Sequence, residues 1–227
     1  MILKSYEIKF SRPRGFLVLD GVNGAGKTTL MKRIVRHLQE RSFPVLSTRE
    51  PGATALGAEL RRILLASKPG TVAPLSEVFL FAADRHNHVK QLIEPALKQG
   101  HVVLSDRYYY STTAFQGYGR ELDLNIVQAI NDVAIAGCLP DFLLLLDLEP
   151  EEGLRRAGLR LDSQDKDGFE QEGLEFHHRL RRGFLEIAKN CAEPVVVLDA
   201  SLSQDQIWME TAPLIDAWLA VLKREGA

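Results

Sequence analysis

The sequence predicts an α/β fold, with a five-stranded parallel sheet and helices on both of its faces. Short apolar runs that end in a carboxylate or another polar residue alternate with longer stretches of helical spacing, as in βαβ units. The apolar runs lack polar/apolar alternation, so helices should cover both faces of the sheet. With 227 residues, 45% of them hydrophobic, the chain is long enough to bury a large core. We therefore expect residues 1–227 to form a single domain.

The elements are expected in a regular order along the chain. The predicted strands are Phe16–Asp20, Pro44–Thr48, His101–Asp106, Asp141–Asp147 and Pro194–Asp199. The predicted helices are 27–41, 56–66, 75–98, 124–136, 150–158, 170–191 and 204–223, with Pro95 kinking or ending the third. Residues 1–14 are expected to form a polar leader. The stretch 160–168 lacks periodicity, and we expect a short lid over about 156–169.

Charge and composition exclude several classes of protein. Lys and Arg number 28 against 30 Asp and Glu, and the formal net charge of −2 offers no basic field for a nucleic-acid polymer. The apolar runs are far shorter than the ~20 residues of a membrane span, and no secretory signal begins the chain. Two cysteines, Cys138 and Cys191, are too few for a disulfide scaffold. We expect a cytoplasmic protein with buried thiols and no membrane partner.

A phosphate-binding motif follows the first predicted strand directly. Residues 21–29 match G-x-x-x-x-G-K-[ST] in the strand–loop–helix setting that the motif requires. Glycines let backbone N–H groups turn toward phosphate oxygens, the Lys27 ammonium neutralises charge, and the Thr28 hydroxyl can ligate Mg²⁺. We expect Lys27 to face solvent when the loop is empty. The predicted phosphate-binding residues are Gly21, Val22, Asn23, Gly24, Ala25, Gly26, Lys27, Thr28 and Thr29.

Charged residues also end the third predicted strand, where open α/β sheets keep their ligands. Asp106 can help to coordinate a metal ion or interact with the attacking group, and Arg107 can bind a phosphate with two parallel hydrogen bonds. The alternative is a structural ion pair that caps the strand.

Phe81 and Arg85 lie four residues apart and therefore on one helical face. An aromatic plate beside a guanidinium suits a nucleobase. By periodicity alone, however, Phe81 is a core residue and Arg85 belongs to a solvated face.

The chain also contains a set of ordered motifs. They are Gly21–Thr29, Thr48–Gly52, Leu80–Arg85, Asp106–Tyr108, Ser111–Gly117, Pro140–Asp147 and Phe169–Glu172. In this order the motifs resemble those of the thymidylate kinase family of P-loop nucleoside monophosphate kinases. The resemblance implies transfer of the γ-phosphoryl group of ATP to dTMP with Mg²⁺, giving dTDP and ADP for dTTP biosynthesis. It also implies a homodimer.

The resemblance assigns roles to residues of this chain. Phe81 would stack on thymine, while Arg85, Thr112 and Gln116 would bond its polar edge and Phe115 would lie against the sugar. The acceptor phosphate would be held by Arg49, Arg61 and Arg107. Lys27 would serve ATP, with Thr28 and Asp106 as ligands of its Mg²⁺. The implied dTMP site comprises Asp20, Asn23, Arg49, Arg61, Phe81, Arg85, Arg107, Thr112, Phe115 and Gln116.

Two positions depart from the family pattern. Asn23 replaces a carboxylate that accepts from the sugar 3′-hydroxyl, and Gly168 replaces an arginine of the lid. Arg156 and Arg160 lie four apart on the helix that enters the lid, so they are expected to supply the missing catalytic charge. The expected catalytic residues are Lys27, Asp106, Arg107, Arg156 and Arg160.

Two other functions stay open at this point. Because of Asn23, the acceptor could be another nucleotide or a deoxynucleoside. A P-loop switch or regulatory ATP-binding module would need no acceptor site at all, and the arginines assigned to the acceptor argue against it.

Overall fold

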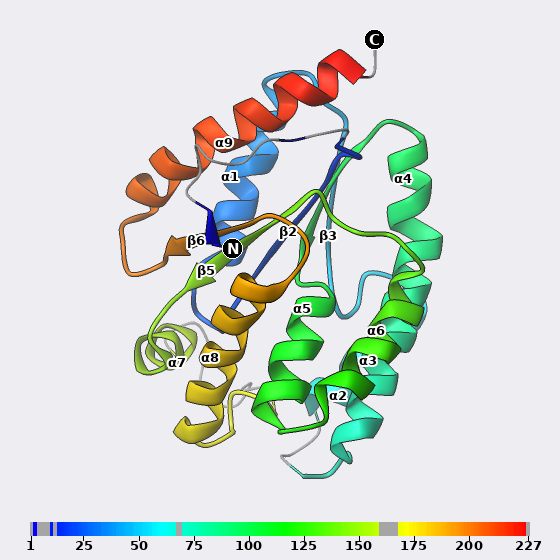
Figure 1. Ribbon diagram of the computed structural model, residues 1–227, viewed down its shortest axis with the longest axis vertical. Coiled ribbons are helices and arrows are strands. Elements are labelled where there is room, and N and C mark those ends of the chain that lie inside the picture. Colours follow the sequence, from blue (N-terminus) through cyan, green and yellow to red (C-terminus); the bar gives the residue numbers. More distant parts are fainter. Residues whose placement is uncertain (1, 4–9, 11–12, 67–69, 159–167, 226–227) are drawn as a thin grey trace.

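A computed structural model describes residues 2–3, 10, 13–66, 70–158 and 168–225, and a parallel sheet runs through its centre (Figure 1). The six strands of the described residues lie in the order β1-β6-β5-β2-β4-β3. They are β1 Ile2–Leu3, β2 Phe16–Gly21, β3 Val45–Arg49, β4 Val102–Asp106, β5 Phe142–Asp147 and β6 Val195–Asp199. The predicted fold class is confirmed, because all five predicted strands are present and parallel. A short sixth strand, β1, lies within residues 1–14, the stretch expected to be a polar leader, and it pairs with β6.

Burial differs between the centre and the edge of this sheet. Every residue of β2 is buried, as are the apolar residues of β4 and β5 on either side of it. The prediction that both faces are covered holds for these strands. It fails at the edge strand β3, where Ser47 and Arg49 are exposed.

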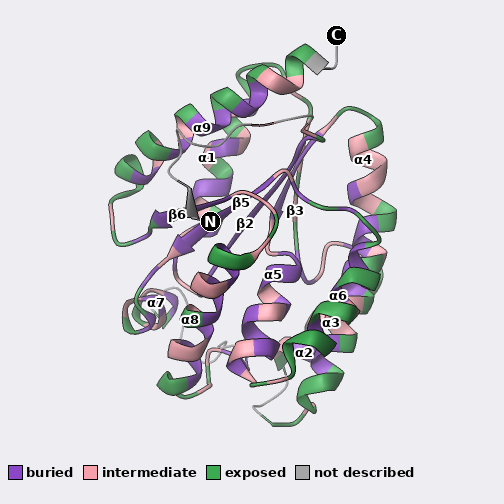
Figure 2. Cartoon of the chain, viewed as in Figure 1, coloured by how far each residue is buried: buried purple, intermediate pink, exposed green. Residues whose placement is uncertain are grey.

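Helices cover both faces of the sheet, with the buried residues turned toward it (Figure 2). The helix α1 packs against β2, β3 and α9, while α4, α5 and α8 contact β4, β2 and β5. Because parallel crossovers are right-handed, α1 lies on one face and the helices between β3 and β6 on the opposite face, while α9 contacts α1 and shares its face. The helical segments are α1 Lys27–Gln39, α2 Ala55–Ala66, α3 Pro74–His88, η1 Val89–Ile93, α4 Glu94–Lys98, α5 Tyr109–Thr112, η2 Thr113–Gly119, α6 Leu124–Ile135, α7 Pro150–Gly158, α8 Leu174–Asn190 and α9 Gln204–Glu225.

The third predicted helix, 75–98, is confirmed, since the chain stays helical from Pro74 to Lys98. Of the two effects expected of Pro95, kinking or ending this helix, it does not end it, and it follows a wider π-helical turn, η1. Two other helix predictions are wrong. Helix α8 begins at Leu174, since 170–173 form a turn. The helix formed by α5 and η2 was not predicted at all. Its aromatic and β-branched residues have low intrinsic helix propensity, so tertiary contacts decide its conformation.

The register of the central strands places the phosphate-binding loop and two charged strand ends side by side. Leu19 of β2 pairs with Asp106 of β4, and Asp106 pairs in turn with Arg49 of β3. The carboxyl ends of these strands therefore meet at one edge of the sheet, which is where ligands bind in open α/β folds.

Candidate active site

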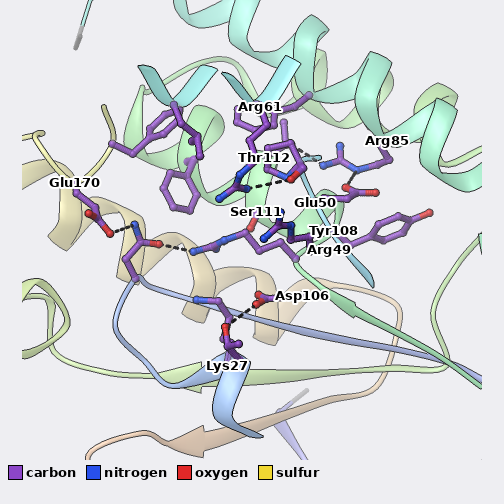
Figure 3. A pocket seen from close by; sticks show the side chains of 18 of the residues that line it. Lys27, Arg49, Glu50, Arg61, Arg85, Asp106, Tyr108, Ser111, Thr112 and Glu170 are labelled. Atoms are coloured by element: carbon purple, nitrogen blue, oxygen red, sulfur yellow. Dashed lines mark hydrogen bonds and ion pairs between the residues drawn. The ribbon is translucent and has the colours of Figure 1, made fainter. Parts of the chain in front are cut away.

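A cavity of about 340 Å³ opens at this edge of the sheet. Figure 3 shows Lys27 and Asp106 at one end of it and Arg85, Glu50 and Thr112 at the other. The lining residues are Asn23, Gly24, Lys27, Thr28, Arg49, Glu50, Pro51, Arg61, Leu65, Phe81, Arg85, Asp106, Arg107, Tyr108, Ser111, Thr112, Phe115, Gln116, Ala157, Phe169 and Glu170.

The phosphate-binding loop is shaped by glycines with positive φ. Gly26 has φ of 95° where α1 begins. Gly24 has φ of 78°, and a Cβ on it would lie 2.1 Å from the carbonyl oxygen of Gly153 in α7. The loop is therefore packed directly against the backbone of α7, and only glycine fits at position 24.

Lys27 lies inside the loop and is only 7% exposed. Its Nζ donates hydrogen bonds to the carbonyl oxygens of Gly21, at 3.0 Å, and Val22, at 2.9 Å. The prediction that Lys27 faces solvent is wrong, because the loop's own carbonyls solvate the ammonium group.

The Thr28 hydroxyl donates to Asp106 Oδ2 at 3.3 Å, and both side chains line the cavity. Oxygen ligands of this kind suit Mg²⁺, which typically takes one or two protein ligands together with substrate phosphates. Within the described ranges, no group of three or more His, Cys, Asp or Glu side chains could hold a metal ion. A magnesium ion at this place would therefore take its protein ligands from Thr28 and Asp106.

Arg107 joins the phosphate-binding loop to the opposite wall of the cavity. Its backbone has φ of 74°, a conformation that is rare for a residue other than glycine. Its Nη1 donates to Asp20 Oδ1, the carbonyl oxygen of Gly21 and the Ser111 hydroxyl, each at 3.0 Å. Its guanidinium carbon lies 5.2 Å from the centre of the Phe115 ring. These contacts fix the guanidinium in one orientation.

Asp20 is fully buried and does not line the cavity. Burial raises the pKa of Asp20, while the charges of Arg107 and Lys27 and a hydrogen bond from Ser111 oppose that rise. Asp20 is expected to contact dTMP, but in the structure its carboxylate lies outside the cavity lining and binds the Arg107 guanidinium.

Asn23 has protein partners at both ends of its amide. Its Oδ1 accepts from Arg107 Nη2 at 2.5 Å, and its Nδ2 donates to Glu170 Oε1 at 3.1 Å. The acceptor atom expected to meet a sugar hydroxyl is thus already engaged by Arg107.

At the far end of the cavity, Arg85 is 1% exposed and carries a dense set of hydrogen bonds. Its guanidinium donates to Glu50 at 2.8 Å, to Asn131 at 2.9 Å and to Thr112 at 3.0 Å. Glu50 is itself buried and also contacts His88 at 2.9 Å. The interpretation of Arg85 as a solvated surface residue is wrong, because the buried carboxylate of Glu50 compensates its charge.

Aromatic rings form the walls between the two ends. Phe169 lies 6.1 Å from Phe81 and 5.4 Å from Phe115, measured between ring centres. All three side chains line the cavity, so it offers flat apolar surfaces of the kind on which a base or sugar packs.

Asp84, a buried carboxylate near Glu50, has a raised pKa. Burial, followed by the nearby charge of Glu50, raises the pKa of Asp84 to about 6. Asp84 Oδ1 accepts from the backbone N–H of Gly52 at 3.2 Å. Asp84 does not line the cavity, and its ionisation in the folded protein costs free energy at neutral pH.

Of the two expected lid arginines, the structure describes Arg156, which does not line the cavity. Arg156 donates to Glu152 at 2.6 Å and to the carbonyl oxygen of Ala200 at 2.9 Å, and it does not line the cavity. Glu152 lies one turn earlier on α7 and captures the Arg156 and Arg155 guanidiniums together. Arg160 lies outside the described residues.

The remaining predicted residues of the dTMP site do line the cavity, Arg49, Arg61, Thr112 and Gln116 among them. Sequence reasoning gave no role to Glu50, Tyr108, Ser111 or Glu170. Each of these lies inside one of the ordered motifs, which was the available signal. For Leu65 and Ala157 we find no signal in the sequence.

The fold and the cavity together define a class of protein. A P-loop on the central strand faces a wall of arginines across a cavity with aromatic sides, as in a phosphotransferase that acts on a nucleotide. Among the helices of the described residues, none is long and apolar enough to cross a membrane.

Comparison with known proteins identifies the family. The profile of the thymidylate kinase family matches residues 19–210. The chain is 44% identical over 189 residues to the thymidylate kinase of Desulfosudis oleivorans, covering 82% of this chain and 88% of that one. It is 42% identical to that of Nitratidesulfovibrio vulgaris strain DP4, covering 93% and 100%. The crystal structure of thymidylate kinase from Ehrlichia chaffeensis superposes with a TM-score of 0.71 at 28% identity, covering 88% and 97%. The chain belongs to the thymidylate kinase family, whose activity is the phosphorylation of dTMP.

Proposed function

We propose that the cavity holds ATP and dTMP end to end, with the ATP phosphates on the P-loop and thymine between Phe81 and the α5–η2 helix. The observation that carries this proposal is that Lys27, the arginines assigned to the acceptor and the Phe81–Arg85 pair line one cavity. The transferred group then lies between the two substrates, and in-line transfer needs positioning and charge neutralisation rather than a protein nucleophile.

Three cations hold the acceptor phosphate in this arrangement. Arg49 ends strand β3, Arg61 lies on α2 and Arg107 follows β4, and all three line the cavity. Arg61 donates to the carbonyl oxygen of Pro51 at 3.0 Å, which orients its guanidinium. Three positive charges match a phosphate dianion.

Lys27 and Arg107 stabilise the charge that spreads over the phosphoryl oxygens in the transition state, and Asp106 stands beside the attacking group. Thr28 and Asp106 would hold Mg²⁺, which neutralises phosphate charge when bound. To take part in catalysis, Arg156 must leave Glu152 when substrates bind, because its present partners hold it outside the cavity. The lid proposed over about 156–169 falls mostly outside the described residues.

A coupled assay of ADP release with ATP and Mg²⁺, in the presence and absence of dTMP, tests this function. We expect ADP release to depend on dTMP, with dTDP formed in equal amount. ADP release that is the same without dTMP would favour a P-loop switch or ATPase without an acceptor site.

We further propose that the chain works as a homodimer through α2, α3 and α6. Helix α3 contacts both α2 and α6, and apolar side chains stand exposed on these helices, among them Phe79 at 56% and Val133 at 76% exposure. A second copy would cover these side chains. Light scattering coupled to size exclusion should give twice the chain mass, and Val133→Glu should shift the mass toward that of a monomer.

A further inference from the structure

We propose that Glu77 sets which bases the site accepts, by holding the Gln116 amide with its carbonyl oxygen toward the base. This inference rests on the proposed placement of thymine against Gln116. Glu77 would act as a positioning residue, because its carboxylate contacts Gln116 and does not line the cavity.

The contact between the two side chains has a defined polarity. Gln116 is fully buried, and its Nε2 donates to Glu77 Oε2 at 2.9 Å. Glu77 is also buried and accepts from Arg120 Nη2 at 3.1 Å and Nε at 3.3 Å. An ionised carboxylate paired with a guanidinium can only accept hydrogen bonds. Glu77 therefore selects the NH₂ end of the Gln116 amide, and the carbonyl end must point away from it.

The carbonyl end of Gln116 belongs to the cavity side. Gln116 lines the cavity, and no donor from the described part of the chain reaches its buried Oε1. A buried acceptor without a donor is costly, so this atom favours a ligand that brings an N–H group. The neighbouring cavity residue Arg85 carries only donors.

The two residues together form a donor beside an acceptor. Thymine and uracil present the complementary pattern, a carbonyl O4 beside an N3–H. Cytosine presents the inverse pattern, an amino group beside an unprotonated N3. With Gln116 locked, cytosine would set acceptor against acceptor at N3 and donor against donor at the exocyclic group, and binding would leave buried groups unpaired.

Glu77 lies on the same helix as two residues that contact the base in the proposed arrangement. Glu77, Phe81 and Arg85 recur at intervals of four residues on α3, so they share one face. One stripe of α3 thus combines the residue that orients Gln116, an aromatic surface for the base and a donor for its carbonyl group.

The test compares Glu77→Gln with the wild type, using the ratio of kcat/KM for dTMP to kcat/KM for dCMP. The amide that this substitution introduces can donate as well as accept, so it no longer fixes the orientation of Gln116. We expect the ratio to fall at least tenfold, with dCMP gaining relative to dTMP. Thermal unfolding of each variant reports whether the fold is kept, and the ratio itself does not change with the fraction of active enzyme.

Glu172→Gln is the matched control. Glu172 pairs with the other side of the Arg120 guanidinium, so this variant removes a carboxylate from the same cluster without touching Gln116. We expect it to keep the wild-type ratio. The double variant Glu77→Gln/Gln116→Glu returns an obligatory acceptor to position 116, with the amide at position 77 donating to it, and should restore most of the preference for dTMP.

The proposal is overturned if Glu77→Gln keeps the wild-type ratio, if Glu172→Gln lowers it equally, or if the double variant stays as unselective as Glu77→Gln. A wild-type enzyme that shows no preference for dTMP would instead refute the proposed function. The two failures are therefore distinguishable.

Discussion

The two ends of the cavity are built in different ways. The phosphate end is built around one contiguous segment, residues 21–29, whose glycines and helix start supply backbone groups and whose Lys27 supplies charge, with Asp106 beside it. The base end comes from side chains far apart in the sequence, with Arg85 held by Glu50 and Gln116 held by Glu77. Phosphate is recognised by its charge, which backbone dipoles and a few cations match. A base is recognised by the order of its donors and acceptors, which requires each polar side chain to be fixed by a partner behind it.

Removal of the Lys27 ammonium should have the largest effect on catalysis. Lys27→Ala removes the charge that stabilises the phosphoryl oxygens, and we expect kcat to fall by at least about 10²–10³-fold. The carbonyl groups of Gly21 and Val22 lose their partner, so the unfolding midpoint should also fall moderately. Steady-state kinetics at saturating ATP, with thermal unfolding as the control for folding, measures both. A folded variant with near-normal kcat would remove the P-loop from the mechanism.

Arg107 contacts groups on both sides of the cavity, and we expect the planar shape of its guanidinium, with several donors, to matter more for activity than its charge. Lysine keeps the charge but cannot reach Asp20, Ser111 and Asn23 at once. Loss of one charge-assisted bond to substrate corresponds to ~1.5–3 kcal/mol, or about 10- to 150-fold in kcat/KM for dTMP. Arg155→Lys, at an exposed position on α7, is the control. Wild-type kinetics for Arg107→Lys would mean that a point charge suffices there.

Asp84 should make the stability of the folded protein depend on pH. Its pKa is raised in the folded protein to about 6, above the ordinary value of 3.8, so the folded state binds the proton more tightly than the unfolded state. Ionised Asp84 therefore lowers stability fully above pH 6, and this penalty disappears as pH falls toward 4. Asp84→Asn should stabilise the protein by about 1–3 kcal/mol at pH 8.

Denaturant unfolding of the wild type and Asp84→Asn at pH 8 and pH 5 measures this difference. The gap between the two should shrink at the lower pH. A constant gap would show that Asp84 has an ordinary pKa.

The smallest effect is expected at Arg156. Because Glu152 and the Ala200 carbonyl hold its guanidinium outside the cavity, Arg156→Ala should lower kcat less than tenfold and much less than changes at Lys27. Arg155→Ala, which loses a contact to the same Glu152, is the matched variant. A loss of tenfold or more for Arg156→Ala alone, with KM for dTMP unchanged, would mean that Arg156 swings into the cavity during the reaction.

The difference between the two ends of the cavity also explains which parts of the site could be predicted from the sequence. The P-loop was predictable because its chemistry depends on spacing within a few residues. The four-residue interval placed Phe81 and Arg85 on one face, but it gave no information on Glu50, which lies 35 residues before Arg85 and makes its burial possible. Lys27 was expected in solvent because a motif does not show which carbonyl groups surround its ammonium. The helix over residues 109–119 was missed because its contacts with α8 and α6 are tertiary.

The family resemblance supplied residues that spacing alone did not, among them Thr112, Phe115 and Gln116. It did not supply the residues behind them. The four-residue interval puts Glu77 on the face of Phe81 and Arg85, but it does not show that Glu77 contacts Gln116, and no local pattern marks Asn131, which contacts Arg85. Asp20 was expected to touch dTMP, yet its position below Arg107 follows from strand register and burial.

Competition between dTMP and dCMP tests whether a nonselective phosphate end is joined to a base end of fixed polarity. Equal concentrations of dTMP and dCMP are mixed with the wild-type enzyme, ATP and Mg²⁺, and dTDP and dCDP are quantified at low conversion, so that their ratio equals the ratio of the two kcat/KM values. We predict an excess of dTDP of at least about 100-fold, because an inverted hydrogen-bond pattern at the base edge costs several kcal/mol. Comparable amounts of the two diphosphates, or an excess of dCDP, would show that the base end has no fixed polarity that favours thymine.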